Sequence, residues 1–440
     1  MHQVFTFTAK IIPGQVDDLK AYLGSLAPGQ PNSGDLPLSK LKNLHFASLV
    51  IVDASAALPP YLVFENNIDG TIDAHIERLC SAAASGLHEM FSRCEAYGTG
   101  PVDVGRLRRY LRDRVLLPNA AFVGNCGRSV RRINAESGLV DDIENRVDGL
   151  LSAGPAPASQ ELYDAVRSAI AGDKSWALAP KGRLSGSDLL KRRLRVLALI
   201  PLGLLELFVR PAVAILIVRR VSGKKPPLLL SLALVAAPVV AIAIVLRYHE
   251  TRDKPNTSPL LPQQLKRLTA AEDKVGQNHF ASVSEVKAGG FRRSVLRIVL
   301  FVIGRLAAGV YVNGMLGLLD NIHFAQWVVL DDGRRLLFLT NYDGSWENYL
   351  DDFIDKAANG LTAIWSNTAG FPRARFLFWG GATNERQFKT SARRTQIPAA
   401  VWYSAYPELT VTTIENNSAL RDGLAKRLQG SAVDTWLQRL

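Results

Sequence analysis

The strongest constraint on the fold is an internal duplication, in which one stretch of sequence recurs in the second half of the chain. Residues 45–53 read HFASLVIVD, and residues 323–331 read HFAQWVVLD. Residues 61–70, YLVFENNIDG, return as RLLFLTNYDG at residues 335–344, and each copy then runs into a segment with helical spacing. The chain therefore contains one module twice, and the two copies flank a long apolar insert.

The elements follow the same order in both copies. Runs rich in β-branched and aromatic residues alternate with segments of helical spacing, which predicts the order β-α-β-β-α-β, the ferredoxin-like split motif. Pro118 and Pro398 stand two residues before Ala120 and Ala400, so the entry to the last strand is repeated as well. The predicted fold class is α+β, with tandem ferredoxin-like modules on either side of a transmembrane helical hairpin.

Composition along the chain divides it into five segments. The first ferredoxin-like module occupies residues 1–150, and a linker rich in Ala, Pro, Gly and Ser occupies residues 151–190. The transmembrane hairpin is expected over residues 191–254 and a linker helix over residues 255–277. The second module then fills residues 278–440.

Two apolar runs support the predicted hairpin. Residues 228–246 contain no charged side chain, and a helix of about 20 residues spans a hydrocarbon core of about 30 Å. Residues 196–218 form the second run, in which Glu206 and Arg210 are spaced to pair on one helical face. Because two spans bring the chain back to the side where it started, both modules are expected on the same side of the membrane.

The positive charge of the chain is concentrated in this insert. The formal net charge is +12, and Lys and Arg outnumber Asp and Glu by ten between Lys181 and Lys254. Cations that border apolar runs favour anionic lipid headgroups, whereas nucleic-acid binding would place them on the folded modules. We therefore expect an integral membrane protein that contacts the lipid bilayer and no nucleic acid. The positive-inside rule places both modules in the cytoplasm.

Residues 291–312 combine a wide apolar face with a stripe of Arg293, Arg297 and Arg305. One interpretation is a long core helix packed on its sheet. The other is a helix that lies in the membrane interface with its arginines at the level of the headgroups.

Two histidines coincide in the duplication, His45 and His323, and each opens a central strand. A histidine in this place can ligate haem iron or act as a general base, although a packing role also explains its presence in both copies. His2 and His279 stand near the opening strands in different registers. His75 and His88 are not duplicated and are weak metal candidates.

The second duplicated polar set is an Asp-Gly pair, Asp69-Gly70 and Asp343-Gly344. At a strand-to-helix junction the Asp accepts exposed N–H groups, and the Gly supplies a permissive backbone. The alternative makes Asp343 an acid or base at the mouth of a pocket.

Several common functions lack their motifs in this sequence. We find no phosphate-binding loop, no dinucleotide fingerprint, no H-E-x-x-H and no G-x-S-x-G. The three cysteines form no C-x-x-C pair and are expected to be small buried side chains. Aromatic residues gather in the second module, where they could line an apolar pocket or fill the core. They are Trp327, Tyr342, Trp346, Trp365, Trp379, Trp402 and Tyr403.

The tandem β-α-β-β-α-β order resembles the duplicated ferredoxin-like, α+β-barrel superfamily that includes dye-decolorising peroxidases and chlorite dismutases. Those peroxidases carry a G-x-x-D-G motif, and the nearest strings here are NNIDG at residues 66–70 and TNYDG at residues 340–344, both without the leading glycine. The resemblance implies haem as a possible cofactor, with His323 or His45 as its ligand. It also implies a catalytic role for Asp343, with His323.

The sequence thus predicts a membrane-anchored protein that binds a small apolar or haem-like ligand, or a partner, at the membrane surface. A haem-dependent, peroxidase-like oxidoreductase and a non-catalytic membrane scaffold are the two alternatives.

Overall fold

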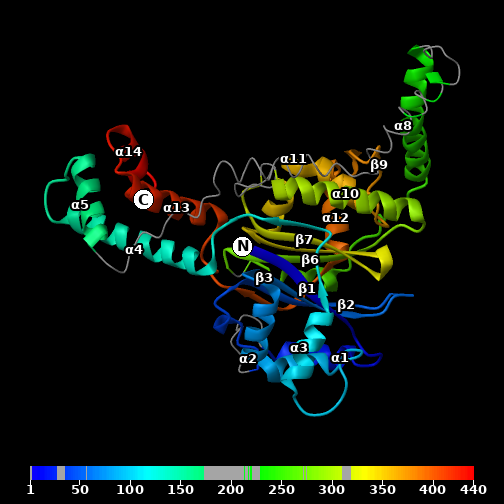
Figure 1. The fold of residues 1–440 in the computed structure, drawn as a ribbon, viewed down its shortest axis with the longest axis horizontal. Helices are drawn as coiled ribbons and strands as arrows, with labels where there is room; N and C mark the ends of the chain where they lie inside the picture. Colours follow the sequence, from blue (N-terminus) through cyan, green and yellow to red (C-terminus); the bar gives the residue numbers. More distant parts are fainter. Residues whose placement is uncertain are drawn as a thin grey trace.

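The computed structural model describes residues 2–26, 35–55, 57–172, 228–270, 272–273, 275–309 and 319–440, with four single positions between residues 213 and 220. These residues form two antiparallel sheets of five strands each (Figure 1). The expected α+β class is confirmed, and the two sheets are consistent with a duplicated module. Among the described residues, no strand is hydrogen-bonded to both sheets.

The first sheet has the strand order β12-β2-β3-β1-β4. Its strands are β1 (His2–Lys10), β2 (Leu44–Val52), β3 (Tyr61–Asp69), β4 (Val115–Leu116) and β12 (Ala399–Ser404). Alternate side chains such as Phe7, Leu49 and Phe64 point to one face and join the core beneath a helical layer. That layer contains α1 (Val16–Ser25), α2 (Ile72–Phe91) and α3 (Val104–Asp113), and the turn η1 (Leu38–Lys40) adjoins it.

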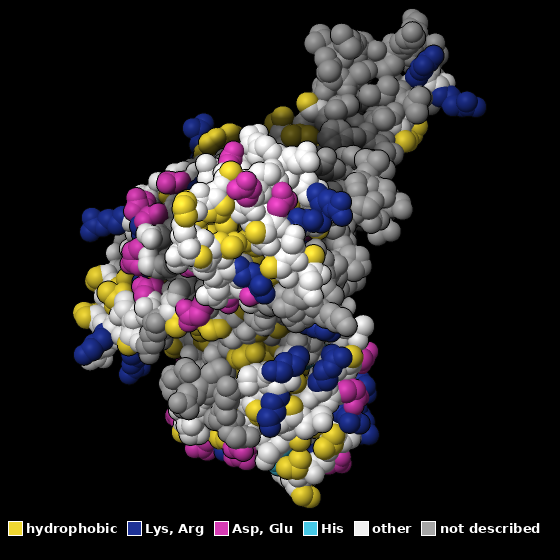
Figure 2. Space-filling model, turned by 90° about the vertical axis from the view of Figure 1, so that its left-hand side faces the viewer, with side chains coloured by type: hydrophobic (Ala, Val, Ile, Leu, Met, Phe, Trp, Pro, Cys, Tyr) yellow, Lys and Arg dark blue, Asp and Glu magenta, His cyan; other side chains and the backbone are white. Residues whose placement is uncertain are grey.

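Several charges on the helices of this module are paired. Arg108 lies 2.7 Å from Glu77, and Arg112 forms ion pairs with Asp73 and Glu77. Positive charges on α3 are therefore compensated by negative charges on α2. On the face shown in Figure 2, basic and acidic side chains lie next to one another over the lower part of the molecule.

The second sheet has the strand order β11-β6-β8-β7-β5. Its strands are β5 (Ala120–Val123), β6 (Gln277–Glu285), β7 (Ile322–Leu330), β8 (Arg335–Asp343) and β11 (Gln396–Ile397). Helices α10 (Gly290–Gly309), α11 (Trp346–Trp365) and α12 (Glu385–Thr395) cover its outer face, with the turns η3 (Asp331–Gly333) and η4 (Gly381–Thr383) and the hairpin β9 (Ala374–Arg375) and β10 (Trp379–Gly380).

The last strands are exchanged between the modules, which the sequence did not predict. Strand β4 pairs with β1 of its own module, but β5 then pairs with β7 of the other sheet. In the same way β11 pairs with β6, and β12 pairs with β2. Pro118 and Pro398 lie where each strand changes partner, because proline has no N–H to continue the ladder. Each sheet is therefore completed by the other half of the chain.

The two sheets face each other across a filled interior. An apolar cluster at one end contains Val50, Val63, Val328 and Leu339, which come from both sheets. Polar side chains follow in the middle of the interior, and histidines and carboxylates lie at the opposite end. Sheet packing thus brings the two copies of the duplicated motif together.

Four helices form a separate unit next to the sheets. They are α4 (Val130–Ser152), α5 (Ser159–Gly172), α13 (Val411–Lys426) and α14 (Ser431–Leu437). Their own core includes Tyr163, whose hydroxyl donates to the Gly423 carbonyl, and Trp436. The beginning of the segment expected to be a linker, residues 151–190, is therefore packed structure up to Gly172.

The segment 291–312 is a core helix where the structure describes it. Leu296 and Leu300 of α10 are buried in the core of the second module. A Cβ atom added at Gly304 would lie 3.4 Å from the Cα atom of Ala120 in β5. Ile298 and Val302, on the other face of α10, are exposed. The interpretation as a core helix therefore holds for the face towards the sheet.

The apolar insert is described only in its second half. Helix α8 (Leu228–Thr251) covers the run 228–246 and projects from the body (Figure 1), and α9 (Pro262–Thr269) lies within residues 255–277. Among the helices in the described part of the chain, none meets the length and hydropathy of a membrane span. The other predicted span, residues 196–218, lies outside the described residues except for Val213 and Ile217.

Candidate functional site

The duplicated histidines occupy equivalent irregularities in the two sheets. The pairing of β2 with β3 shifts between Leu44 and Phe46, and that of β7 with β8 shifts between Ile322 and Phe324. His45 and His323 are therefore the extra residues of two β-bulges, and a bulge redirects a side chain relative to the regular pleat. Both histidine side chains are almost completely buried.

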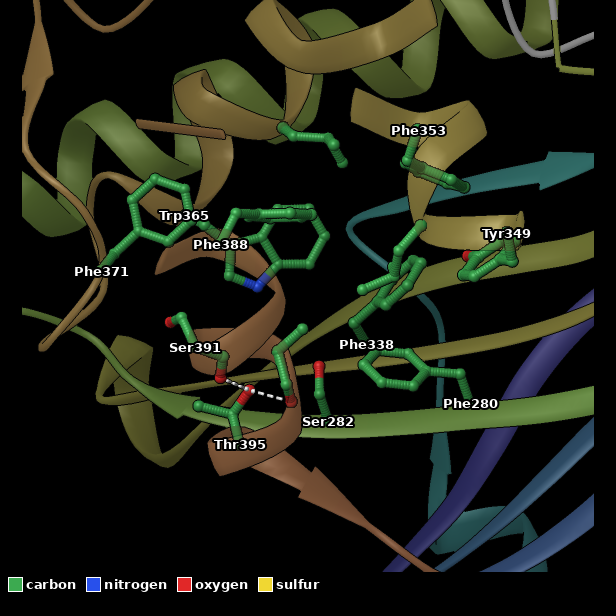
Figure 3. Close-up of a pocket in the computed structure, with 13 residues that line it drawn as sticks. Phe280, Ser282, Phe338, Tyr349, Phe353, Trp365, Phe371, Phe388, Ser391 and Thr395 are labelled. Carbon is green, nitrogen blue, oxygen red and sulfur yellow. Dashed lines mark hydrogen bonds between the residues drawn. The ribbon is translucent and has the colours of Figure 1, made fainter. Parts of the chain in front are cut away.

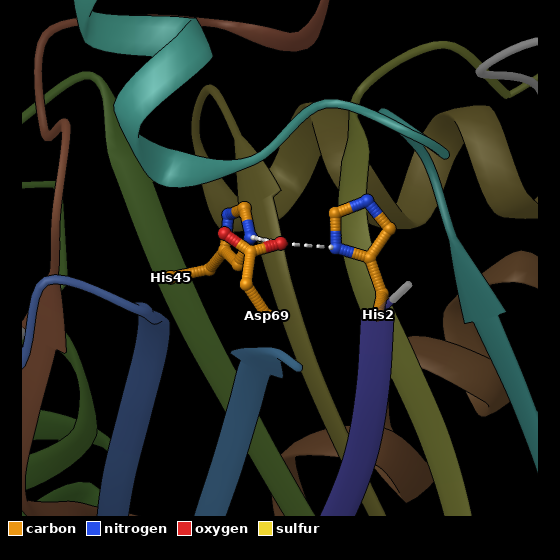
Figure 4. Close-up of side chains that lie close together, drawn as sticks. All are labelled: His2, His45 and Asp69. Atoms are coloured by element: carbon orange, nitrogen blue, oxygen red, sulfur yellow. Dashed lines mark ion pairs between the residues drawn. The ribbon is translucent and has the colours of Figure 1, made fainter. Parts of the chain in front are cut away.

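In the first copy, three side chains meet at the end of the sheet (Figure 4). His45 Nε2 lies 3.2 Å and His2 Nδ1 lies 3.3 Å from the same carboxylate oxygen, Asp69 Oδ1. The second oxygen of Asp69 accepts a 2.8 Å hydrogen bond from the backbone N–H of Val130, the first residue of α4. The Asp69 carboxylate therefore joins two strands to a helix.

The second copy repeats this arrangement with one change. His323 Nε2 lies 2.7 Å from Asp343 Oδ1, and the backbone N–H of Val411, the first residue of α13, donates to Asp343 Oδ2 at 2.7 Å. Gln277 pairs with Asp343 in the sheet as His2 pairs with Asp69, so it takes the place of His2. We call these two sets the His-Asp clasps.

The clasps correct the expected role of the Asp-Gly pairs. The helices that follow these pairs, α2 and α11, are capped by Thr71 and Ser345. Asp69 and Asp343 instead bind the helices that follow the exchanged strands. The permissive backbone expected of the glycines is present, since Gly70 has φ 91° and Gly344 has φ 81°.

A sequence signal for these distant partners exists and was missed. Residues 129–139 read SVRRINAESGL and residues 410–420 read TVTTIENNSAL, which share a hydroxyl residue, Val, Ile, Ser and Leu at the same positions. Ser129 and Thr410 cap α4 and α13 through their side chains. The duplication therefore extends one helix beyond the β-α-β-β-α-β unit.

The electrostatics of the first clasp favour a neutral imidazole beside a carboxylate. Burial would raise the pKa of Asp69, but hydrogen bonds from His2, His45 and Val130 hold it well below 3.8. Burial lowers the pKa of His45 below 6.5. The Tyr406 hydroxyl lies 2.8 Å from His45 Nδ1, so the hydrogen-bond network assigns the donor proton of His45 to Nε2, facing Asp69.

His2, His45 and Asp69 are also close enough to be considered as metal ligands. The backbone N–H of Gly127, however, donates to His2 Nε2 at 3.0 Å. That bond requires Nε2 to be the unprotonated nitrogen, which leaves the proton on Nδ1, the atom that faces Asp69. We therefore describe the group as a clasp of two ion-pair contacts on one carboxylate; the two facing nitrogens make no hydrogen bond of regular geometry among the described residues.

The residues suggested for haem do not fit that group in this arrangement. The Nε2 atom of His323 faces Asp343 and Gln277, and its ring is packed 5.0 Å from Phe46 and 5.9 Å from Tyr406 between ring centroids. Both nitrogens of His45 likewise face protein groups. Nδ1 of His323 is buried without a hydrogen-bond partner among the described residues, but the ring is enclosed by Phe46 and Tyr406, and both oxygens of Asp343 are engaged.

A further polar cluster lies between the sheets around Glu65, a residue that sequence reasoning missed. Its carboxylate accepts from Ser48, Asn67, Gln326 and Asn341 at 2.7 to 3.2 Å. His279 Nε2 lies 3.0 Å from Glu65 Oε2 and forms a buried pair with it. The available signal in the sequence was Glu65 itself, a charged residue within an apolar strand. The second copy has Leu339 at the equivalent inward position.

The remaining histidines do not form a metal site together. His75 contacts Asn66 and Asn43, whereas Nδ1 of His88 lies 2.9 Å from the hydroxyl of Tyr97. Cys80 and Cys94 are buried, as expected, whereas Cys126 is only partly buried.

Two apolar cavities lie on the helix side of the second sheet. The smaller, of about 30 Å³, is nearly filled by aromatic rings that include Phe338 and Trp365 (Figure 3). The larger, of about 480 Å³, lies between α10 and α11 over Trp327 and shares Phe353 and Leu361 with the smaller one. We call the larger cavity the α10–α11 pocket.

The aromatic set of the second module is thus divided among different places. Trp327 and Trp365 line the cavities, and Tyr342 and Trp346 are buried in the core. Trp402 donates to Asn341 between the sheets, and Trp379 is exposed. Only part of the set lines a pocket.

Comparison with known proteins adds no family. Neither the family models nor the curated protein sequences nor the solved structures compared with this chain gives a significant match.

Proposed function

We propose that this chain is a membrane-anchored protein whose second module binds a small apolar molecule in the α10–α11 pocket. The observation that carries the proposal is the pocket of about 480 Å³ with Trp327 on its wall. Trp327 is 2 % exposed, so its ring forms part of the apolar floor of the pocket.

The size and lining of the pocket support an apolar ligand. Sites for small molecules usually measure about 300–1,000 Å³ and combine apolar walls with a few polar groups. Ile303 and Leu306 from α10 face Ile354 and Leu361 from α11, while Asp355, Lys356 and Asn359 supply the polar part of the lining. Lys356 is paired with Asp352 at 2.7 Å, so its charge is already compensated.

Membrane anchoring is the second part of the proposal. Helix α8 exposes Val240, Ile242 and Ile244 in its projecting part, and apolar surface of this kind is stabilised in lipid rather than water. We propose that α8 forms the hairpin 191–254 with the run 196–218, that the hairpin's cations contact anionic headgroups, and that both modules are cytoplasmic.

The fold is proposed to belong to the duplicated α+β-barrel superfamily, supported by two facing sheets that complete each other. The geometry favours ligand binding over a haem peroxidase, because His323, His45 and Asp343 are engaged in the clasps. A non-catalytic scaffold is the alternative, and it accounts for the clasps but leaves the pocket without a role.

Cavity filling tests the proposed function. Full-length protein is purified, extracted with organic solvent, and the extract analysed by mass spectrometry. We expect an apolar molecule to copurify with wild type and to fall about tenfold in Leu306→Trp, a loss of about 1.4 kcal/mol in binding free energy. Ile298→Trp, two turns away at an exposed position of α10, is the matched control. Equal content in both variants would contradict the proposal, and a Soret band that His323→Ala removes would favour the haem alternative.

A further inference from the structure

The hairpin of β9 and β10, residues 374–380, holds an unusual backbone at the foot of α8. Phe376 has φ 50° and Leu377 has φ 65°, a left-handed conformation that is unfavourable for a residue other than glycine. The backbone N–H groups of Phe376 and Leu377 donate to the two carboxylate oxygens of Glu250 at 2.9 and 2.8 Å. Glu250 therefore fixes the shape of the hairpin.

Glu250 belongs to α8, and the end of this helix is fixed to the body. Arg247 lies 2.6 Å from Glu250 and also donates to the Ala374 carbonyl at 3.3 Å. Two residues beyond the helix, Asp253 pairs with Arg292 of α10 at 2.7 Å. Figure 1 shows β9 beside the lower end of α8. These contacts therefore hold the hairpin next to the C-terminal end of α8.

The fixed hairpin exposes large aromatic side chains. Trp379 is 60 % exposed and Phe378 is 47 % exposed. Exposure of such large apolar side chains to water is unfavourable. The buried Glu250 carboxylate stabilises the hairpin, and Trp379 is turned outward. The hairpin is therefore suited to contact a lipid membrane or another molecule.

Cations lie over two neighbouring aromatic rings, those of Phe376 and Tyr248. The Arg247 and Arg375 guanidinium groups lie 5.3 and 5.7 Å from the Phe376 ring, and that of Arg252 lies 3.4 Å from the Tyr248 ring. Arg252 and Arg375 are exposed. The nearby acid, Glu250, is buried and engaged by the backbone. The local surface is therefore aromatic and positively charged.

We infer that the hairpin 374–380 is a membrane-interface anchor, in which Trp379 and Phe378 enter the boundary of the acyl chains while Arg252 and Arg375 bind anionic phosphate headgroups. The inference rests on the proposed membrane insertion of α8. On that helix the exposed apolar side chains end at Val245 and the cations begin at Arg247, which marks the level of the interface. Tryptophan and arginine are both favoured at this depth.

Fluorescence of Trp379 in vesicles tests the anchor. Full-length protein is reconstituted in phosphatidylcholine vesicles with or without phosphatidylglycerol, and brominated acyl chains serve as quencher. We expect wild type to be quenched and Trp379→Phe to lose that quenching. Trp436→Phe, which removes a tryptophan buried in the α14 core, is expected to keep it. Phosphatidylglycerol should increase the quenching, and the double variant Arg252→Gln and Arg375→Gln should lose this increase.

The outcomes separate this inference from the proposed function. If the protein inserts into vesicles but wild type and Trp379→Phe are quenched equally, the anchor is overturned and the proposed insertion stands. If the protein does not associate with vesicles, both are overturned. A blue shift of Trp379 emission that depends on protein concentration, without quenching by lipid, would assign the hairpin to a contact between two copies of the chain.

Discussion

At the scale of single residues, the buried polar groups of the clasps connect strands to helices, and the oxygens of their carboxylates are occupied by these contacts. Each clasp uses both oxygens of one carboxylate, one for a histidine in a bulge and one for the first N–H of a helix. A carboxylate at a helix N-terminus also interacts favourably with the helix dipole. These contacts explain why His and Asp-Gly recur together in the two copies.

The buried His75 gives the stability of the fold a dependence on pH. Burial lowers the pKa of His75 from 6.5 to about 4, while an unfolded histidine keeps a pKa of about 6.5. Between these values the unfolded chain binds the extra proton, so stability falls as the pH drops, by up to about 3 kcal/mol. Burial acts on His45 in the same direction.

Urea unfolding of wild type and His75→Gln measures this effect. The glutamine can still donate to Asn66, which lies 3.0 Å from His75 Nε2, but it does not titrate. We expect the variant to lose less stability than wild type between about pH 6.5 and about pH 4. Identical pH profiles would show that His75 does not carry the effect.

At the scale of elements, the bent last strand is the feature that connects the modules. Strand β5 approaches β7 so closely that a Cβ atom added at Gly124 would lie 2.2 Å from the Ile322 carbonyl oxygen. This close approach sits beside the bulge that holds His323. Glycine at this position is therefore required by backbone contact.

A pair of glycine substitutions tests this contact. Gly124→Ala is expected to lower the free energy of unfolding by about 1–3 kcal/mol, because backbone atoms must move. Gly149→Ala in α4, where an added Cβ meets nothing within 4 Å, should instead stabilise by about 0.5–1 kcal/mol. Thermal or chemical unfolding distinguishes the two signs. A neutral Gly124→Ala would mean that β5 is not tightly paired with β7.

At the scale of the whole molecule, exchange of the last strands makes the two halves depend on each other. Strand β2 is covered by β12, and β7 is covered by β5. A half produced alone leaves a long unpaired sheet edge, which favours aggregation.

Coexpression of the two halves tests this dependence. Residues 1–172 and residues 255–440 should each be insoluble or unfold without cooperativity when expressed alone. We expect the two fragments together to form a soluble complex that copurifies through a tag on one of them. Cooperative unfolding of either fragment by itself would show that the exchanged strand is dispensable.

The sequence by itself determined the duplication, the α+β class and the order of strands and helices, because these depend on local spacing of apolar residues and on proline and glycine. It also placed His45, His323, Asp69 and Asp343 at equivalent positions in the two copies.

Only the tertiary structure decided which strand completes which sheet, what each carboxylate binds, and where a cavity remains. Val130 and Val411 lie 61 and 68 residues from their carboxylate partners, and the α10–α11 pocket arises between helices that are separated by a sheet hairpin in the chain. Such contacts depend on how surfaces pack in three dimensions, and local sequence patterns do not record them.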